Sequence, residues 1–101
     1  MTHHRATLEQ AVAAAFGVPR EELLAPTRRC APAAFARQVA MYLAHICYGL
    51  TFTQVGELFA RDRTTVAHAC ATVEDMRDDA ALDRALAALE KALSAAAPEV
   101  A

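Results

Sequence analysis

The link between two amphipathic segments, residues 52–59 and 63–77, constrains the fold of this chain more than any other feature. Thr51 and Gln54 match a helix-capping box and would open the first segment as a helix. Asp62 is a favourable N-cap for the second segment. Two helices joined by so short a link, with small polar groups at the start of the second, are typical of a helix-turn-helix.

The second segment, residues 63–77, has one apolar and one polar face at helical spacing. The apolar face comprises Val66, Ala69, Cys70 and Val73, and the opposite face presents Thr64, His68, Ala71 and Asp75, with Thr65 on the flank. A helix N-terminus offers unpaired N–H groups and partial positive charge, which suit a phosphate-lined groove with base edges within reach. Taken alone, however, this stretch favours the simpler interpretation of an ordinary capped helix on a small bundle.

The rest of the chain also favours helices over strands. Its hydrophobic fraction is 55%, but 26 residues are Ala, which buries little area and is the best helix former. A chain of 101 residues is long enough for one domain with one core. We therefore expect an all-α fold, a compact single-domain bundle of about six helices over residues 1–101, with a core at about 7–94 and frayed termini.

Capping residues divide the flanking segments into further helices. Thr7 and Gln10 would cap a first helix, and residues 19–24 would form a short second one. Towards the C-terminus, Asp78 or Asp79 would cap a last helix that packs on the bundle or on a second copy of it. The apolar stripe of this last helix comprises Leu82, Leu86, Leu89 and Leu93.

The longest predicted helix covers residues 32–48 and follows an exposed loop at residues 25–32, which carries Arg28 and Arg29 between two prolines. Apolar residues lie on two sides of this helix, as expected of a central helix that is covered from both directions. One side comprises Phe35, Val39, Leu43, Ile46 and Leu50, and the other carries Arg37, Met41 and Tyr48.

The positive charge of the chain is concentrated around the predicted helix-turn-helix. The net charge of −2 is not that of a generic nucleic-acid binder. Residues 1–72, however, hold seven Arg against five acidic residues, whereas residues 73–101 hold three basic residues against seven acidic ones. Five of the arginines lie between Arg28 and Arg63. This asymmetry favours an anionic partner at the helix-turn-helix.

The three cysteines, Cys30, Cys47 and Cys70, indicate neither a disulfide framework nor a metal site. Their number is odd and the sequence shows no secretion signal or membrane-spanning window, so we expect reduced thiols and a cytoplasmic location. Cys47 and Cys70 each follow a histidine by two positions, but residues two apart on a helix point about 200° apart and cannot share one ion. No base is evidently placed beside either thiol, so we expect no enzymatic activity, no cofactor and no metal.

Three runs of the sequence resemble one known family. They are Ala36–Ala44 (ARQVAMYLA), Gln54–Phe59 (QVGELF) and Arg61–Ala69 (RDRTTVAHA), in this order and at near-family spacing. They resemble the C-terminal DNA-binding domain of the bacterial replication initiator DnaA, which carries R-Q-x-A-M-x-L-A, then x-I-G-x-x-F, then R-D-H-T-T-V-x-H-A. The resemblance covers about residues 7–90 and implies a Trp-repressor-like helix-turn-helix that binds double-stranded DNA without chemistry.

The resemblance also implies which residues contact DNA. They are Arg28, Arg29, Arg37, Gln38, Arg61, Asp62, Arg63, Thr64, Thr65 and His68. The first two match the loop arginine that enters the minor groove, and the next two match residues that grip the DNA at the start of the long helix. Residues 62–65 match the segment that enters the major groove, where arginine can pair with guanine, a threonine methyl suits thymine and aspartate can accept from cytosine. Arg61 and His68 are expected beside phosphates.

Four features depart from the family pattern. Arg63 replaces the family histidine, so the base read at this step is expected to differ. Ala60 stands where the family has Gly-Gly, which makes the turn one residue shorter and is expected to tilt the reading helix. Ala71 and Thr72 replace basic residues, which lowers the expected affinity for the DNA backbone, and Thr53 replaces a proline.

The sequence contains no G-x-x-x-x-G-K-[ST] loop, so no nucleotide site and no ATP-driven assembly are expected. The leading hypothesis is a free-standing reader of duplex DNA at initiator-like sites that regulates replication initiation or transcription in the bacterial nucleoid. A homodimer or tandem sites would raise the specificity of so small a footprint, with the leucine stripe or Met41 and Tyr48 as contact surfaces. The alternative is an all-helical protein-interaction module that retains the fold but has lost specific DNA binding, which the acidic tail favours.

Overall fold

The computed structural model describes residues 2–23 and 31–96. The elements of this part are α1 (Thr2–Phe16), the 3-10 helix η1 (Arg20–Leu23), α2 (Ala31–Tyr48), α3 (Phe52–Phe59), α4 (Arg63–Met76) and α5 (Ala80–Ala96). The predicted all-α fold is confirmed. In the described residues it consists of five α-helices and one 3-10 helix, so the predicted count of about six helices was slightly high, because residues 20–23 form a single tight turn.

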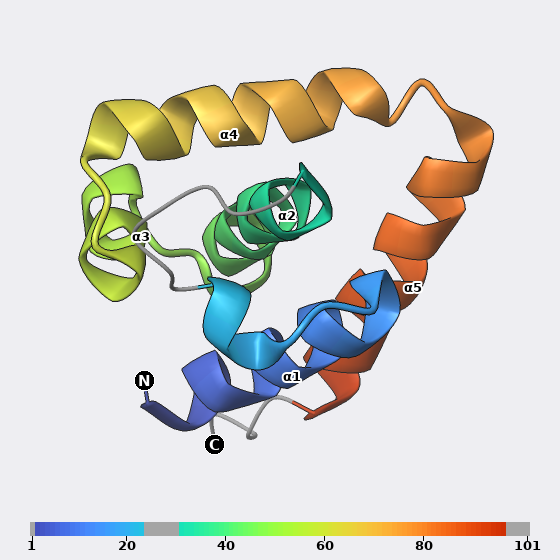
Figure 1. Cartoon of the computed structure of the whole chain (residues 1–101), viewed down its shortest axis with the longest axis horizontal. Coiled ribbons are helices and arrows are strands. Elements are labelled where there is room, and N and C mark those ends of the chain that lie inside the picture. Colours follow the sequence, from blue (N-terminus) through green and yellow to red (C-terminus); the bar gives the residue numbers. More distant parts are fainter. Residues whose placement is uncertain (1, 24–30, 97–101) are drawn as a thin grey trace.

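Helix α2 lies at the centre of the bundle, with α4 crossing on one side and α1 and α5 on others (Figure 1). Its side chains Val39 and Leu43 are fully buried, which confirms the prediction of a central helix. Ile46, which the sequence pattern placed in the buried stripe, is 43% exposed. The pattern failed there because the last turn of α2 is only partly covered, as the half-buried Cys47 and Tyr48 show.

Helix α1 begins at Thr2, so the prediction that Thr7 caps the start of the first helix was wrong. Thr7 lies within the helix and is half-buried. Residues 2–16 contain no Gly or Pro, and each residue added to an existing helix gains one backbone hydrogen bond. Extension of the helix through Thr7 is therefore more favourable than a helix start at that residue.

The last helix, α5, packs on the bundle. Asp79 Oδ1 accepts hydrogen bonds from the backbone N–H groups of Ala81 (2.9 Å) and Leu82 (3.4 Å), which confirms the second of the two predicted caps. Leu86 and Leu93 are almost fully buried, in contact with the core that α1 and α2 also form. The idea that the leucine stripe serves as a surface for a second copy was therefore wrong, and so was the same idea for Met41, which is 2% exposed.

Candidate nucleic-acid interface

The turn between α3 and α4 closes on the backbone of Gly56. The Gly56 carbonyl accepts hydrogen bonds from the N–H groups of Ala60 and Arg61, the second at 2.9 Å. A Cβ atom at position 56 would lie 2.4 Å from the Arg61 carbonyl oxygen, closer than real Cβ contacts allow. Only glycine therefore fits at position 56 without movement of the turn.

Ala60 takes the left-handed conformation (φ 56°, ψ 45°) that glycine adopts freely at the end of a helix. For a residue with a Cβ atom, this conformation costs roughly 1–2 kcal/mol. The shortened turn thus has an alanine in a conformation that favours glycine, and α4 still starts at Arg63, directly after its N-cap Asp62.

Asp62 caps the N-terminus of α4, as predicted. Its Oδ1 accepts a hydrogen bond of 2.8 Å from the backbone N–H of Thr65. Hydrogen bonds from Thr65, and to a lesser extent from Thr64, stabilise the carboxylate and hold the pKa of Asp62 below its ordinary value. One carboxylate oxygen is therefore engaged in orienting the helix end.

The polar face of α4 is open to solvent. Thr64, Thr65 and His68 are exposed, and Arg63 is exposed at the first position of the helix. Ala71 and Asp75 continue this exposed face, which confirms the predicted orientation of the segment, while Val66, Ala69, Cys70 and Val73 are buried.

An open groove of about 610 Å³ runs between α2 and α4. Its walls are formed by Ala34, Arg37, Gln38 and Met41 from α2, by Thr64, Thr65, His68, Ala69 and Thr72 from α4, and by Arg61 and Asp62 from the turn. The structure thus brings together seven of the ten predicted site residues around one concave surface. Arg63 lies exposed at the end of the same helix, and Arg28 and Arg29 fall outside the described residues.

Two arginines of the groove also bind protein carbonyl groups. Arg37 is 5% exposed, and its Nε donates a 2.8 Å hydrogen bond to the carbonyl of Leu23, which ties η1 to α2. Arg61 Nη1 donates to the carbonyls of Phe59 (2.9 Å) and Ala60 (3.3 Å), at the C-terminal end of α3. The Arg37 bond therefore anchors the groove wall formed by α2, whereas the Arg61 bonds are local to the turn. Sequence reasoning missed both roles.

Sequence reasoning also missed four lining residues of the groove, which are Ala34, Met41, Ala69 and Thr72. A signal for Thr72 was present, since it follows Thr64 by eight positions and Thr65 by seven, the spacing of residues on one helical face. A similar signal was present on α2, because Ala34 and Met41 lie three or four positions from the predicted Arg37 and Gln38. That this face of α2 meets α4 depends on how the two helices cross.

The cysteines of the described residues have features of packing residues. Cys70 is buried and Cys47 half-buried, and desolvation raises the pKa of both thiols. A raised pKa lowers the fraction of thiolate, the form that acts as nucleophile or metal ligand. Within residues 2–23 and 31–96, no group of three or more His, Cys, Asp or Glu residues is placed to hold a metal ion. No helix of this part of the chain is long and apolar enough to cross a membrane.

The tight turn, the capped second helix and the groove beside its exposed polar face define a helix-turn-helix domain. The chain matches the family described as "Bacterial dnaA protein helix-turn-helix" over residues 6–73. It therefore belongs to the family of bacterial DnaA C-terminal helix-turn-helix domains.

Curated relatives agree with this assignment. The chain is 37% identical over 89 residues to the chromosomal replication initiator protein DnaA of Sphingopyxis alaskensis, a match that covers 86% of this chain and 19% of that protein. For the same protein of Agrobacterium fabrum, the identity is 39% over 70 residues, covering 68% of this chain and 14% of the relative. For that of Laribacter hongkongensis it is 44% over 59 residues, covering 56% and 12%. The chain thus spans less than a fifth of the length of these relatives.

Proposed function

We propose that this domain binds double-stranded DNA sequence-specifically, with α4 in the major groove, and that it regulates replication initiation or transcription. The observation that carries the proposal is the groove between α2 and α4, which gathers residues of two of the three family-like runs, 36–44 and 61–69, on one concave surface. The relatives are named as replication initiators, and sites like theirs are the first DNA to test. The location that follows is cytoplasmic, at the nucleoid.

Each candidate residue has a role that suits its position. Thr64 and Thr65 are exposed on the first turn of α4, where small side chains reach base edges and a methyl group can meet thymine. Arg63 is exposed beside them and suits bidentate pairing with guanine. Gln38 on α2 and His68 on α4 both line the groove, and they suit contacts to the sugar-phosphate backbone.

The remaining arginines complete the proposal. Arg37 and Arg61 combine a structural bond to a carbonyl with a position in the groove wall, where their charge attracts phosphate. Arg28 and Arg29 are proposed as minor-groove contacts from their match to the family alone. Asp62 acts chiefly by orienting the N–H groups at the start of α4. The proposed activity requires no cofactor, metal or catalytic step.

The decisive experiment measures binding to a labelled duplex that carries the consensus box of the initiator, with a scrambled duplex of the same composition as control. Both are titrated over a salt series, because release of counterions from phosphates makes log K fall linearly with log salt. The proposal predicts preference for the box or a close variant and weaker binding at high salt. Binding to neither duplex at low salt would contradict it.

A second candidate function is a protein-interaction module that retains the fold and has lost specific DNA binding. Two observations favour it: the seven acidic residues in 73–101, and the engagement of Arg37 and Arg61 with protein carbonyls. The same titration separates the two functions, because this candidate predicts equal and negligible affinity for both duplexes at every salt concentration.

A further inference from the structure

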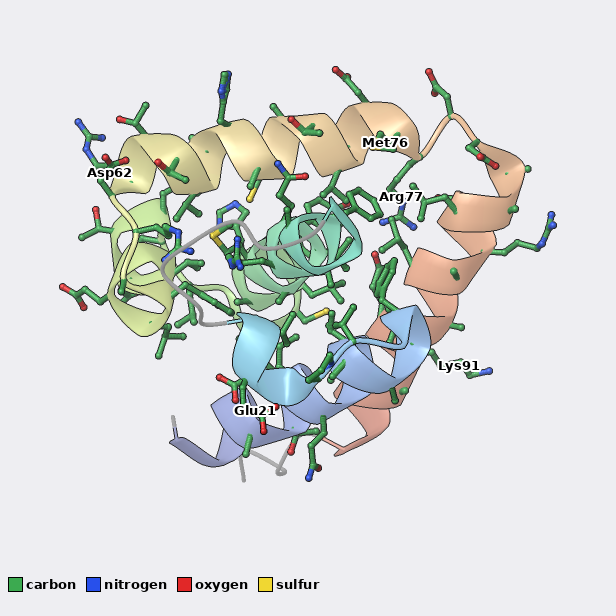
Figure 2. The ribbon with its side chains drawn as sticks, viewed as in Figure 1. Glu21, Asp62, Met76, Arg77 and Lys91 are labelled. Atoms are coloured by element: carbon green, nitrogen blue, oxygen red, sulfur yellow. The ribbon has the colours of Figure 1, made fainter. Side chains whose placement is uncertain are left out.

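A polar cluster joins three helices at the end of α4 that lies away from the turn. We call it the Arg77 cluster, and it consists of Tyr42, Glu74, Arg77, Asp83 and Glu90. The Tyr42 hydroxyl donates to Glu74 Oε1 at 3.0 Å and accepts from Arg77 Nη1 at 3.0 Å. Arg77 Nε donates to Asp83 Oδ1 at 2.6 Å, and its Nη1 also donates to Glu90 Oε2. Figure 2 shows Arg77 in the corner between α2, α4 and α5, with Asp62 at the opposite end of α4.

The chemistry of the cluster gives it a defined geometry. The planar guanidinium of Arg77 binds acceptors from two directions, and the Tyr42 hydroxyl uses both its donor and an acceptor site. Tyr42 is 4% exposed and the Arg77 side chain 20% exposed, so water competes weakly for the hydrogen bond between them. The carboxylates and the hydroxyl that surround Arg77 raise the pKa of its guanidinium, chiefly through Asp83, so the bridge stays charged.

Along both helices, the cluster comes soon after the groove-lining residues. On α2, Tyr42 follows Met41, the last groove-lining residue of that helix. On α4, Glu74 lies two residues beyond Thr72, the last groove-lining residue there. The Tyr42–Glu74 bond therefore links α2 to α4 close to the last groove-lining residue of each helix. Since α4 has 14 residues, its reading end lies about 21 Å away from its other end.

We propose that the Arg77 cluster positions the reading helix: by linking Tyr42 to Glu74 and Arg77, it sets the separation of α2 and α4 and thereby the sequence discrimination of the groove. The inference rests on the proposed DNA-binding function. Base contacts require side chains within about 0.5 Å of the productive geometry, whereas charge attraction to phosphates tolerates larger shifts. A loosened far end of α4 therefore weakens binding to the correct sequence more than binding to other sequences.

Tyr42→Phe is the sharpest test, because it removes one hydroxyl and keeps the ring. The matched control is Tyr48→Phe, the same chemical change on the same helix, at a half-buried position outside the groove and the cluster. Affinities for the box and the scrambled duplex are measured well below the melting temperature of each variant. We expect the box-to-scrambled affinity ratio of Tyr42→Phe to fall about tenfold, which corresponds to about 1.4 kcal/mol, while affinity for the scrambled duplex changes less than about twofold.

Arg77→Lys provides an independent variant that keeps the positive charge. A single ammonium group lacks the fork that bridges Tyr42, Asp83 and Glu90, so its affinity ratio should also fall, although net charge is unchanged. A cluster that merely stabilises the fold would lower the melting temperature of both variants and leave the ratio at the wild-type value, which overturns the inference. If the wild-type chain itself binds neither duplex, the proposed function is overturned and the inference falls with it. If the wild type prefers the box and Tyr42→Phe has the same box-to-scrambled affinity ratio, this inference is overturned and the proposed function stands.

Discussion

The two ends of α4 are built in opposite ways. At the N-terminal end, Arg63, Thr64 and Thr65 are exposed, and the hydrogen bond of Asp62 is local, to a residue three positions away. At the C-terminal end, Arg77 and Glu74 bind residues of α2 and α5 that lie up to 35 positions away in the sequence. One end of the helix presents donors and acceptors to solvent, and the other is held by the rest of the bundle.

This contrast shows how a small domain reconciles recognition with rigidity. Polar groups that bind a ligand are hydrogen-bonded to water, not to other protein groups, while the ligand is absent. They therefore contribute little to the stability of the fold. On the proposed function, the N-terminal end of α4 is therefore positioned by other parts of the domain, namely the turn on one side and the Arg77 cluster on the other. Substitutions at the two supports should therefore change both stability and sequence discrimination, whereas substitutions on the exposed face of α4 should change binding and leave stability nearly unchanged.

Gly56→Ala should have the largest effect, because it disrupts the turn that precedes the N-terminal end of α4. The added methyl would lie 2.4 Å from the Arg61 carbonyl oxygen, and a backbone atom can yield only if the turn moves. We expect a loss of about 3 kcal/mol in the free energy of unfolding, measured by urea denaturation. The control Glu57→Ala, at the exposed next position of α3, should change stability by less than about 0.5 kcal/mol. Equal midpoints for the two variants would contradict the tight turn.

Arg77→Met should have the next largest effect, at the other support. Removal of the guanidinium leaves the carboxylates of Asp83 and Glu90 without their cation and the Tyr42 hydroxyl without its donor. Breaking a fully buried pair costs several kcal/mol, but these carboxylates are 48% and 30% exposed, so we expect a loss of about 2 kcal/mol. Arg84→Met, at an exposed position of α5, is the matched control and should be nearly neutral.

Arg63→Ala should leave stability unchanged and reduce discrimination. If Arg63 pairs with a guanine, its loss should weaken binding to the preferred sequence by about tenfold and relax the preference at one base pair. Competition titrations with duplexes that vary one position at a time measure this effect. Arg84→Ala removes the same charge outside the groove and should leave the preference intact. An equal loss of affinity for every duplex would instead assign Arg63 to a phosphate.

Ala60→Gly should stabilise the fold slightly. It relieves the left-handed strain at φ 56°, and the gain is partly offset by the greater freedom of glycine in the unfolded chain. The net increase in the free energy of unfolding should be about 0.5–1 kcal/mol. Ala71→Gly, at an exposed position inside α4, is the opposite control and should destabilise by about 1 kcal/mol. A loss of stability for Ala60→Gly would argue against the strained turn.

The smallest effect concerns the pH dependence of the Asp62 cap. Because the pKa of Asp62 is lowered in the folded state, its contribution is fully present above the carboxyl's ordinary value, about 3.9, and is lost as the pH falls through the lower folded value. The Asp62→Asn variant keeps a side-chain oxygen that can cap the helix, but its amide does not ionise in this pH range. Between pH 7 and pH 3, the urea midpoint should therefore decrease more for the wild type than for Asp62→Asn. Identical falls would show that the charge of the cap is irrelevant.

Much of the local structure was predictable from the sequence. The capping box of Thr51 and Gln54 is present, with both of its hydrogen bonds, and Asp62 and Asp79 cap the helices that follow them. These signals work because donor and acceptor lie within three residues of one another, so that no other part of the chain is needed to form the bond. The failure at Thr7 shows the limit, since a cap signal inside a stretch without a helix breaker does not end the helix.

The candidate site was predictable in part for a similar reason. The exposed face of α4 follows from helical periodicity, which places Thr64 and His68 on one side. The groove does not follow from periodicity, because it exists only where α2 crosses α4. The bond from Arg37 to Leu23 and the Arg77 cluster were missed, since their partners lie 14 and up to 35 residues away.

The sequence by itself thus determined where α3 and α4 begin and end and which residues of α4 face outwards. It did so through short-range hydrogen bonds and the fixed rotation of about 100° per residue along a helix. The tertiary structure alone decided that Arg37 binds η1, that α5 packs on the bundle, and that Arg77, at the C-terminal end of α4, binds Tyr42 of α2. Those contacts depend on the relative placement of separate helices, which is set by the packing of the whole core.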